Sequence, residues 1–175
     1  TKWLVESGAV TGDACLIAEP TGYFNCEIGQ KGSCWIQLSV SGTPAHGSLS
    51  PFVGDNAIVK LMRILNRIEQ IREIVPRYDD EVARVMEESR AMAKRLLTAP
   101  GAQHVLNHCS VNIGKISGGT KVNMVPDSAY AEVDVRIPLG VTSEMVEEKL
   151  LLIIKEAGVD GVEYSFGWKS EPKCT

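Results

Sequence analysis

Hydrophobic and polar residues alternate regularly in several segments of this chain. The clearest is 33–41, where the even positions Cys34, Ile36, Leu38 and Val40 are all apolar. Successive side chains of a β-strand point to opposite faces of the sheet, so this alternation predicts a strand with one buried face. The other segments with the same period are 109–113, 129–137 and 162–168.

A different period begins at Asp55, where apolar residues recur every three or four positions as far as Ile74. This spacing is typical of an amphipathic helix that buries one face. We expect a helix of about five turns that has Asp55 as its N-cap and ends near Pro76.

Two further helices are predicted. One begins at Asp79, carries Glu and Arg on its polar face, and is interpreted as part of a surface insertion over about 76–103. The other has Thr142 or Ser143 as its cap and is closed by Gly158, because glycine readily adopts the left-handed conformation that ends a helix.

The predicted order of elements is β-α-(α)-β-β-α-β. This order predicts an α+β, ferredoxin-like two-layer sandwich, in which a four-stranded antiparallel sheet carries two helices plus a helical insertion. An unpaired edge of such a sheet is normally covered or paired with another chain. We therefore expect two copies to associate through the first long helix and the edge strand around 109–116.

Composition narrows the classes of partner. The chain has 175 residues, 44% of them hydrophobic, and a formal net charge of -4 with no dense block of Lys and Arg. Nucleic acids and membrane surfaces are bound through clustered positive charge, so neither is expected as a partner. No apolar run reaches the roughly 20 residues that a membrane-spanning helix needs. Five irregularly spaced cysteines fit reduced thiols, which favours a cytoplasmic location.

Three short motifs carry the most specific information. They are Leu-Ile-Ala-Glu-Pro-Thr-Gly at 16–22, Gly-Thr-Pro-Ala-His-Gly-Ser at 42–48 and Ser-Gly-Gly-Thr-Lys-Val-Asn-Met-Val-Pro-Asp at 117–127. In this order and spacing they resemble the zinc amidohydrolases and exopeptidases that include acetylornithine deacetylase, succinyl-diaminopimelate desuccinylase, aminoacylase and carboxypeptidase G. The chain looks like the dimerisation, or lid, domain of that family.

The resemblance also implies a division of the chain. Residues 1–29 would be a remnant of the catalytic domain and a hinge, 30–168 the lid, and 169–175 the return to the catalytic domain. The chain starts with Thr1 and has no capped or charged end, so we expect a fragment of a longer protein. Hinges are expected near 29–32 and 168–172, since a lid must close over its substrate.

Glu19 follows an apolar run and precedes Pro20. One carboxylate does not make a zinc site, which needs three or four ligands, so the residues alone favour a solvated turn acid. The resemblance implies that Glu19 is a ligand to one of two zinc ions per subunit, with cobalt or manganese as alternatives. It places the other ligands outside this chain, so little or no zinc is expected to bind here.

His46 lies in a glycine-flanked turn, and by itself it would be read as a hydrogen-bonded turn histidine. The resemblance implies instead that it reaches into the partner subunit and donates a hydrogen bond to the oxyanion of the scissile amide. Removing such a donor typically costs about 10² to 10³ in rate.

The resemblance implies that four further residues contact the substrate. Asn123, otherwise a turn residue bonded to its own backbone, would border the substrate together with Gly118 and Gly119. Arg136 would hold the α-carboxylate through its planar fork; otherwise it would form a cross-strand ion pair.

The function expected from the resemblance is hydrolysis of the amide bond of N-acyl amino acids or small peptides by a di-zinc homodimer. The chain alone is expected to be inactive, because most metal ligands lie elsewhere. The alternative is a non-catalytic ferredoxin-like module that dimerises or binds a small ligand, since this fold serves many unrelated functions.

Overall fold

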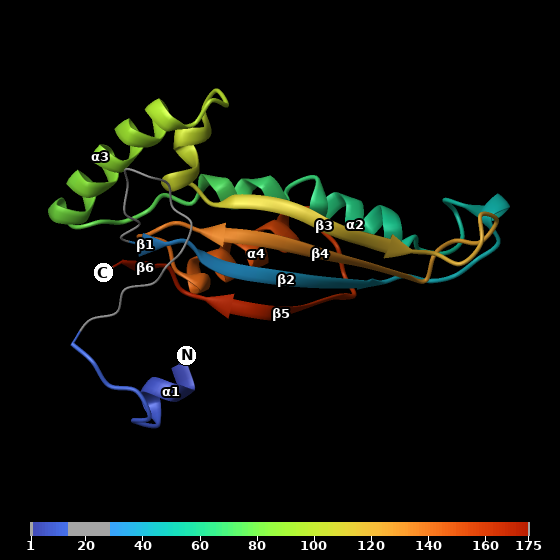
Figure 1. The fold of residues 1–175 in the computed structure, drawn as a ribbon. Helices are drawn as coiled ribbons and strands as arrows, with labels where there is room; N and C mark the ends of the chain where they lie inside the picture. Colours follow the sequence, from blue (N-terminus) through green and yellow to red (C-terminus); the bar gives the residue numbers. More distant parts are fainter. Residues whose placement is uncertain (1, 14–28, 175) are drawn as a thin grey trace.

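The computed structural model describes residues 2–13 and 29–174. Its main feature is an antiparallel sheet with the strand order β3-β4-β2-β5 (Figure 1). The strands are β2 (Gly32–Ser41), β3 (Ser110–Gly118), β4 (Ser128–Ile137) and β5 (Val162–Ser170). The predicted α+β, ferredoxin-like sandwich is confirmed.

Helices cover one face of this sheet (Figure 1). They are α2 (Ala57–Leu65), the 3₁₀ helix η2 (Ile68–Glu73) and α4 (Ser143–Ala157). The core between the layers is built from the apolar positions of the two central strands, since β2 and β4 each bury one face completely. Its fully buried side chains include Ile36, Leu38, Leu61, Ile64, Ile68, Ile71, Val133, Val135, Ile137, Leu150 and Ile153. Burying each such side chain contributes about 1.5–3 kcal/mol.

The helix expected from Asp55 to Pro76 is interrupted. Asn56, not Asp55, caps α2, and its Oδ1 accepts a hydrogen bond from Val59 N at 3.1 Å. Asp55 is held in extended backbone because it pairs with Thr43, so the expected N-cap was wrong. The α-helix ends at Leu65, and the chain continues as the 3₁₀ turns of η2.

The last strand departs from its simple alternation. The register moves from Ile36 opposite Phe166 to Trp35 opposite Trp168, so Gly167 is an extra residue in β5. Such a bulge reverses which face the following residues point to. Trp168 is therefore 56% exposed, although the alternation placed it with the core residues Tyr164 and Phe166.

The expected insertion forms α3 (Asp80–Leu96) and the 3₁₀ helix η3 (Ala102–Leu106), which contact each other. The helix begins at the predicted place, and Asp79 is its N-cap, since its Oδ1 accepts a hydrogen bond from Val82 N at 2.8 Å. Only Met86 of α3 is buried, which fits a surface element. Figure 1 places the insertion at the end of the sheet where β3 begins.

The chain enters and leaves the sheet at that same end. There, β1 (Gly29–Gln30) pairs with β6 (Lys173–Cys174) in an antiparallel two-stranded ribbon. Lys31 follows β1, and its ammonium donates to the carbonyls of Val105 and His108, both at 2.9 Å. These bonds fasten the insertion to the entry of β2. The remaining helix, α1 (Lys2–Glu6), is short, and no helix in the described ranges is long and apolar enough to cross a membrane.

Candidate functional site

Two loops lie together at the opposite end of the sheet and carry two of the three motifs. We call this region the tip, residues 42–56 and 119–127; in Figure 1 it is the end away from the insertion. Several backbone hydrogen bonds hold it together. Thr43 and Asp55 exchange two bonds of 2.8 Å, Val125 N donates to Ala45 O at 2.8 Å, and Gly47 N donates to Asn123 O at 2.8 Å. The tip is therefore an ordered scaffold on both sides of residue 46.

His46 is exposed and precedes the short 3₁₀ helix η1 (Gly47–Leu49). Its Nδ1 accepts a hydrogen bond from Ser48 N at 3.3 Å and lies 2.7 Å from Ser48 Oγ. A backbone N–H can only donate, so in the neutral ring the proton is on Nε2. Among the contacts of the described residues, Nε2 takes none. His46 thus presents a hydrogen-bond donor at the surface of the tip.

The structure brings Asn123 beside His46, because Met124 and His46 form a backbone bridge. The Asn123 side chain is exposed, and the residue is held through its carbonyl. Gly118 and Gly119 line a hollow beside this loop, and local structure explains why both positions require glycine. A Cβ at Gly118 would lie 2.9 Å from Ile58 Cγ1, and Gly119 has φ +73°.

Lys60 is the anchor of the tip that the sequence analysis missed. Its side chain is only 8% exposed, and its ammonium contacts Asp160 at 2.6 Å, Asp55 at 2.7 Å and the carbonyl of Ser41 at 2.9 Å. Hydrogen bonds to Asp160 and Asp55 raise the pKa of Lys60. The Lys60–Asp160 bond also lowers the pKa of Asp160. Lys60 joins the end of β2, the tip and the α4–β5 turn. The sequence did carry a signal for this role, because the helical spacing puts Lys60 on the buried face of α2, between Ala57 and Ile64.

We expect Lys60→Met to lower the free energy of unfolding of this chain by about 1–3 kcal/mol, because it removes the hydrogen bonds that the ammonium donates to Asp160, Asp55 and the Ser41 carbonyl. Urea denaturation measures the change. Lys155→Met, an exposed change on α4, is the control and is expected to cost under about 0.5 kcal/mol. Equal losses in the two variants would contradict the anchoring role.

The loss of stability in Lys60→Met is expected to depend on pH. The lowered pKa of Asp160 means that its contribution is present above the pKa of an unfolded aspartate, about 3.9, and disappears as the pH falls through the lower folded value. The raised pKa of Lys60 keeps its contribution intact up to the ordinary lysine range. The stability difference between wild type and Lys60→Met should therefore stay constant around neutral pH, shrink in acid, and shrink again in alkali as the pH rises through the raised pKa of Lys60.

Arg136 lies far from the tip. It is opposite Ser33 in β2 and Ser110 in β3, at the end of the sheet where the chain enters, whereas Ser128 begins β4 at the tip. Eight residues of strand at about 3.3 Å each separate Ser128 from Arg136 by about 26 Å. The Nε of Arg136 donates to Asp134 of the same strand at 3.0 Å, instead of making the cross-strand pair considered above. One chain therefore does not bring Arg136 and His46 together.

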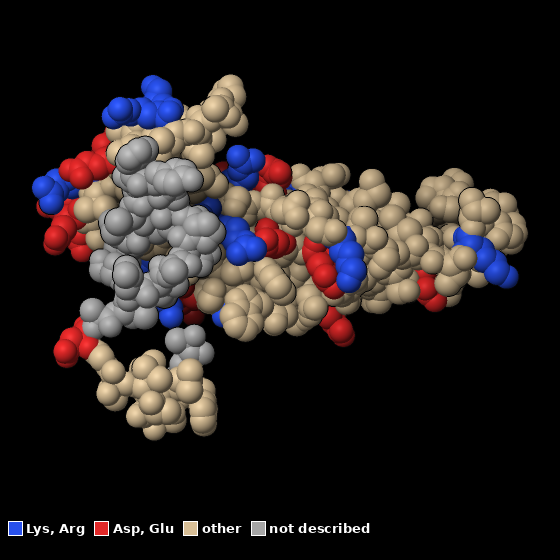
Figure 2. Space-filling view, in the orientation of Figure 1, with Lys and Arg blue, Asp and Glu red and all other residues tan. Residues whose placement is uncertain are grey.

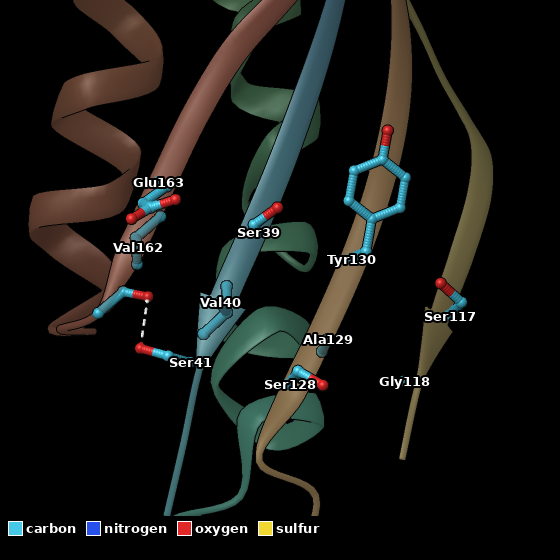
Figure 3. Close-up of a pocket in the computed structure, with 11 residues that line it drawn as sticks. Ser39, Val40, Ser41, Ser117, Gly118, Ser128, Ala129, Tyr130, Val162 and Glu163 are labelled. Atoms are coloured by element: carbon cyan, nitrogen blue, oxygen red, sulfur yellow. Dashed lines mark hydrogen bonds between the residues drawn. The ribbon is translucent and has the colours of Figure 1, made fainter. Parts of the chain in front are cut away.

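The open face of the sheet is hollowed near the tip. Figure 3 shows Ser39, Tyr130 and Glu163 side by side on three adjacent strands, with Ser117 on the fourth. Four of its eleven lining residues are serines, and neither His46, Asn123 nor Arg136 contributes to it. It has no cation to recognise an anionic substrate, so we assign it no catalytic part.

Two buried thiols are poor candidates for nucleophiles. Burial raises the pKa of Cys34 to about 12 and that of Cys109 to about 11. The reactive form of cysteine is the thiolate, which at neutral pH is scarce in both.

Glu19, the expected metal ligand, lies outside the described residues. Within the described part of the chain, no group of three or more His, Cys, Asp or Glu side chains is placed to hold a metal ion. His104 and His108 meet edge to face with ring centroids 6.0 Å apart, and both are exposed, as expected for surface residues. The described residues thus do not fit a zinc site.

Comparison with known proteins identifies relatives. The family model of the peptidase dimerisation domain, M20_dimer, matches residues 28–162. Aminoacylase-1A of Rattus norvegicus is 30% identical over 160 residues, which cover 91% of this chain and 34% of the relative. A probable succinyl-diaminopimelate desuccinylase of Staphylococcus aureus is 30% identical over 148 residues, which cover 77% of this chain and 34% of the relative. The chain spans about a third of the length of these curated relatives.

Solved structures agree on the fold. The di-peptidase Dug1p of Saccharomyces cerevisiae superposes with a TM-score of 0.58 at 15% identity, over 85% of this chain and 38% of its own. The M20 family metallo-carboxypeptidase Sso-CP2 of Sulfolobus solfataricus superposes with a TM-score of 0.57 at 20% identity, over 82% of this chain and 39% of its own. The family match spans well over half of the chain and includes every strand of the main sheet up to the start of β5. The chain therefore belongs to the M20 peptidase dimerisation domain family.

Proposed function

We propose that this chain is the dimerisation domain of a metal-dependent hydrolase that cleaves the amide bond of N-acyl amino acids or small peptides. Residues 30–168 would form the lid, with 1–29 and 169–175 connecting it to a catalytic domain. The pairing of β1 with β6 supports this division, since entry and exit then form one two-stranded connection. The names of the relatives, an aminoacylase and a probable desuccinylase, support amide hydrolysis.

The observation that carries the proposal is the tautomer imposed on His46. Ser48 N donates to Nδ1, so Nε2 carries the proton of the neutral ring at an exposed, rigidly framed position. A neutral imidazole N–H is suited to stabilise an oxyanion as negative charge develops on the carbonyl oxygen. The donor is also oriented before substrate arrives, so little reorganisation is needed in the transition state.

Arg136 is proposed to bind the substrate carboxylate. Its bond to Asp134 uses Nε, and among the described residues the two terminal nitrogens make no bond to a carboxylate. A guanidinium binds a carboxylate bidentately, which fixes orientation as well as charge. Since the tip is about 26 Å from Arg136, His46 and Asn123 would have to come from a second copy.

A homodimer provides such an arrangement. β3 is an edge strand of the sheet, and exposed apolar side chains flank it: Ile113 and Ile116 on the strand, and Val59 and Met62 on α2. Two β3 edges paired antiparallel across a two-fold axis would place the tip of each copy beside the chain-entry end of the other. Each active site would then combine Arg136 of one copy with His46 and Asn123 of the partner.

The metal site is proposed to lie on the catalytic part of the longer protein. Glu19 would be the contribution of this chain, and zinc, or alternatively cobalt or manganese, would polarise the scissile carbonyl there. The donors among the described residues do not form such a site, so we derive no step through the metal.

The test is hydrolysis of N-acetyl amino acids, N-succinyl amino acids and dipeptides by the intact protein purified with zinc. We expect activity on at least one class, its loss after dialysis against a chelator, and its recovery when zinc is added back. The 175-residue chain alone is expected to hydrolyse none of them. Metal-replete intact protein with no activity on any substrate would contradict the proposal and favour a binding module.

A further inference from the structure

The insertion has no part in the function proposed so far, although it occupies a definite place beside the edge strand. η3 directly precedes β3 in the chain, and the 119–127 loop of the tip directly follows it. In an antiparallel β3 pair, the segment before the strand in one copy lies beside the segment after the strand in the other. The proposed homodimer therefore brings the insertion of each copy next to the tip of its partner.

The tip protrudes with apolar side chains. Val122 is fully exposed and Phe52 is 94% exposed, and Leu49, Val53 and Met124 are exposed beside them. Figure 2 shows that this end of the molecule is mainly uncharged, whereas Lys, Arg, Asp and Glu mix over the rest of the visible face. Large apolar groups gathered at a protruding end are typical of a contact surface.

The insertion offers a matching concavity. A groove lies between η3 and the start of β3, and its apolar lining comes from Pro100, Ala102, Val105 and Val111. Exposed Leu96 and Leu97 at the end of α3 extend the apolar surface near it. The groove borders the same edge strand that the partner would pair with.

The size that a stable dimer interface needs also favours contacts beyond the β3 edge. A stable interface usually takes about 20–30 residues from each partner. The edge of β3 has nine residues, and α2 adds two exposed apolar side chains, Val59 and Met62. Contacts at both ends of the strand pair would supply the remainder.

We infer that the apolar tip of one copy docks into the groove between η3 and β3 of its partner, so that the helical insertion clasps the loop that carries His46. This inference rests on the proposed homodimer. The occupant is a second copy of this chain, because β3 pairing delivers its tip to the groove. The clasp would fix the partner's tip where it must reach the substrate.

Sedimentation equilibrium of the 175-residue chain tests the inference with four matched variants. Val122→Asp changes the tip, Val105→Asp the groove and Ile116→Asp the edge strand. Leu152→Asp changes an exposed leucine on α4 that belongs to none of them. We expect the first three to raise the dimer dissociation constant at least about tenfold, and the control to leave it unchanged. At a concentration where the wild type is monomeric, thermal melts of all four should match it, since each replaced side chain is exposed.

Amine cross-linking of a mixture of ¹⁴N- and ¹⁵N-labelled chains provides the geometric readout. Lys121 in the tip should link to Lys94 on α3 in peptides of mixed isotope composition. Val122→Asp and Val105→Asp variants that behave like the Leu152→Asp control, while Ile116→Asp disrupts the dimer, would overturn the docking and leave the dimer standing. A wild-type chain that is monomeric at every concentration would overturn the dimer itself, and the docking with it.

Discussion

Replacing His46 by alanine in the proposed intact hydrolase is expected to lower kcat by about 10² to 10³, with a much smaller change in KM. The proposed hydrogen bond from Nε2 strengthens only as charge develops on the substrate oxygen, so its loss affects the transition state more than the bound substrate. Steady-state kinetics at saturating zinc measures both constants. Metal content, determined in parallel, should not change.

Ser48→Ala is the matched control. It removes the hydroxyl that lies 2.7 Å from Nδ1 but keeps the backbone donor that sets the tautomer. We expect a loss of less than about tenfold, because ring orientation is weakened while the Nε2 donor remains. A His46→Ala enzyme with wild-type kcat would remove His46 from the mechanism, and equal losses in the two variants would assign His46 a role in loop structure alone.

The central part of the fold was predictable because local pattern and burial agree there. β2 and β4 are interior strands with one face against the helices, so Ile36 and Val133 follow strict alternation and are fully buried. Helix ends were predictable where a side chain caps the backbone locally, as Asp79 and Thr142 do. In these cases the decisive contacts lie within four residues of the chain.

Predictions failed where a distant residue decides the local structure. Asp55 looks like an N-cap, but pairing with Thr43 holds it extended and Lys60 takes its carboxylate. Trp168 fits the alternation of its segment, but the bulge at Gly167 is set by pairing with β2 and turns the ring outward. Neither partner can be identified from spacing alone.

In the candidate site, too, local features were predictable and long-range contacts were not. The motif around His46 predicted a turn, but nothing in the sequence placed Asn123 beside it. The bonds that create this proximity join residues more than 70 positions apart, such as Gly47 to Asn123. The separation of Arg136 from the tip follows from the direction of β4, which became known only with the sheet order.

That separation leads to the second prediction, which concerns hybrid dimers. Mixing inactive His46→Ala and Arg136→Ala subunits of the intact enzyme, with exchange of subunits, should restore activity to about a quarter of the wild-type level. Half of the dimers are then hybrids, and each hybrid has one site with both Arg136 from its own chain and His46 from the partner. Activity of the mixture against its mole ratio should be greatest at equal amounts.

The control mixture combines His46→Ala with Asn123→Ala. Both residues lie in the tip, so in a hybrid every site receives one altered tip and none is complete. This mixture should stay inactive although its subunits exchange equally well. If His46 and Arg136 instead served the same site from one chain, neither mixture would gain activity, because each hybrid site would still lack one of the two groups. Recovery in the first mixture alone therefore requires a site that is shared between two copies.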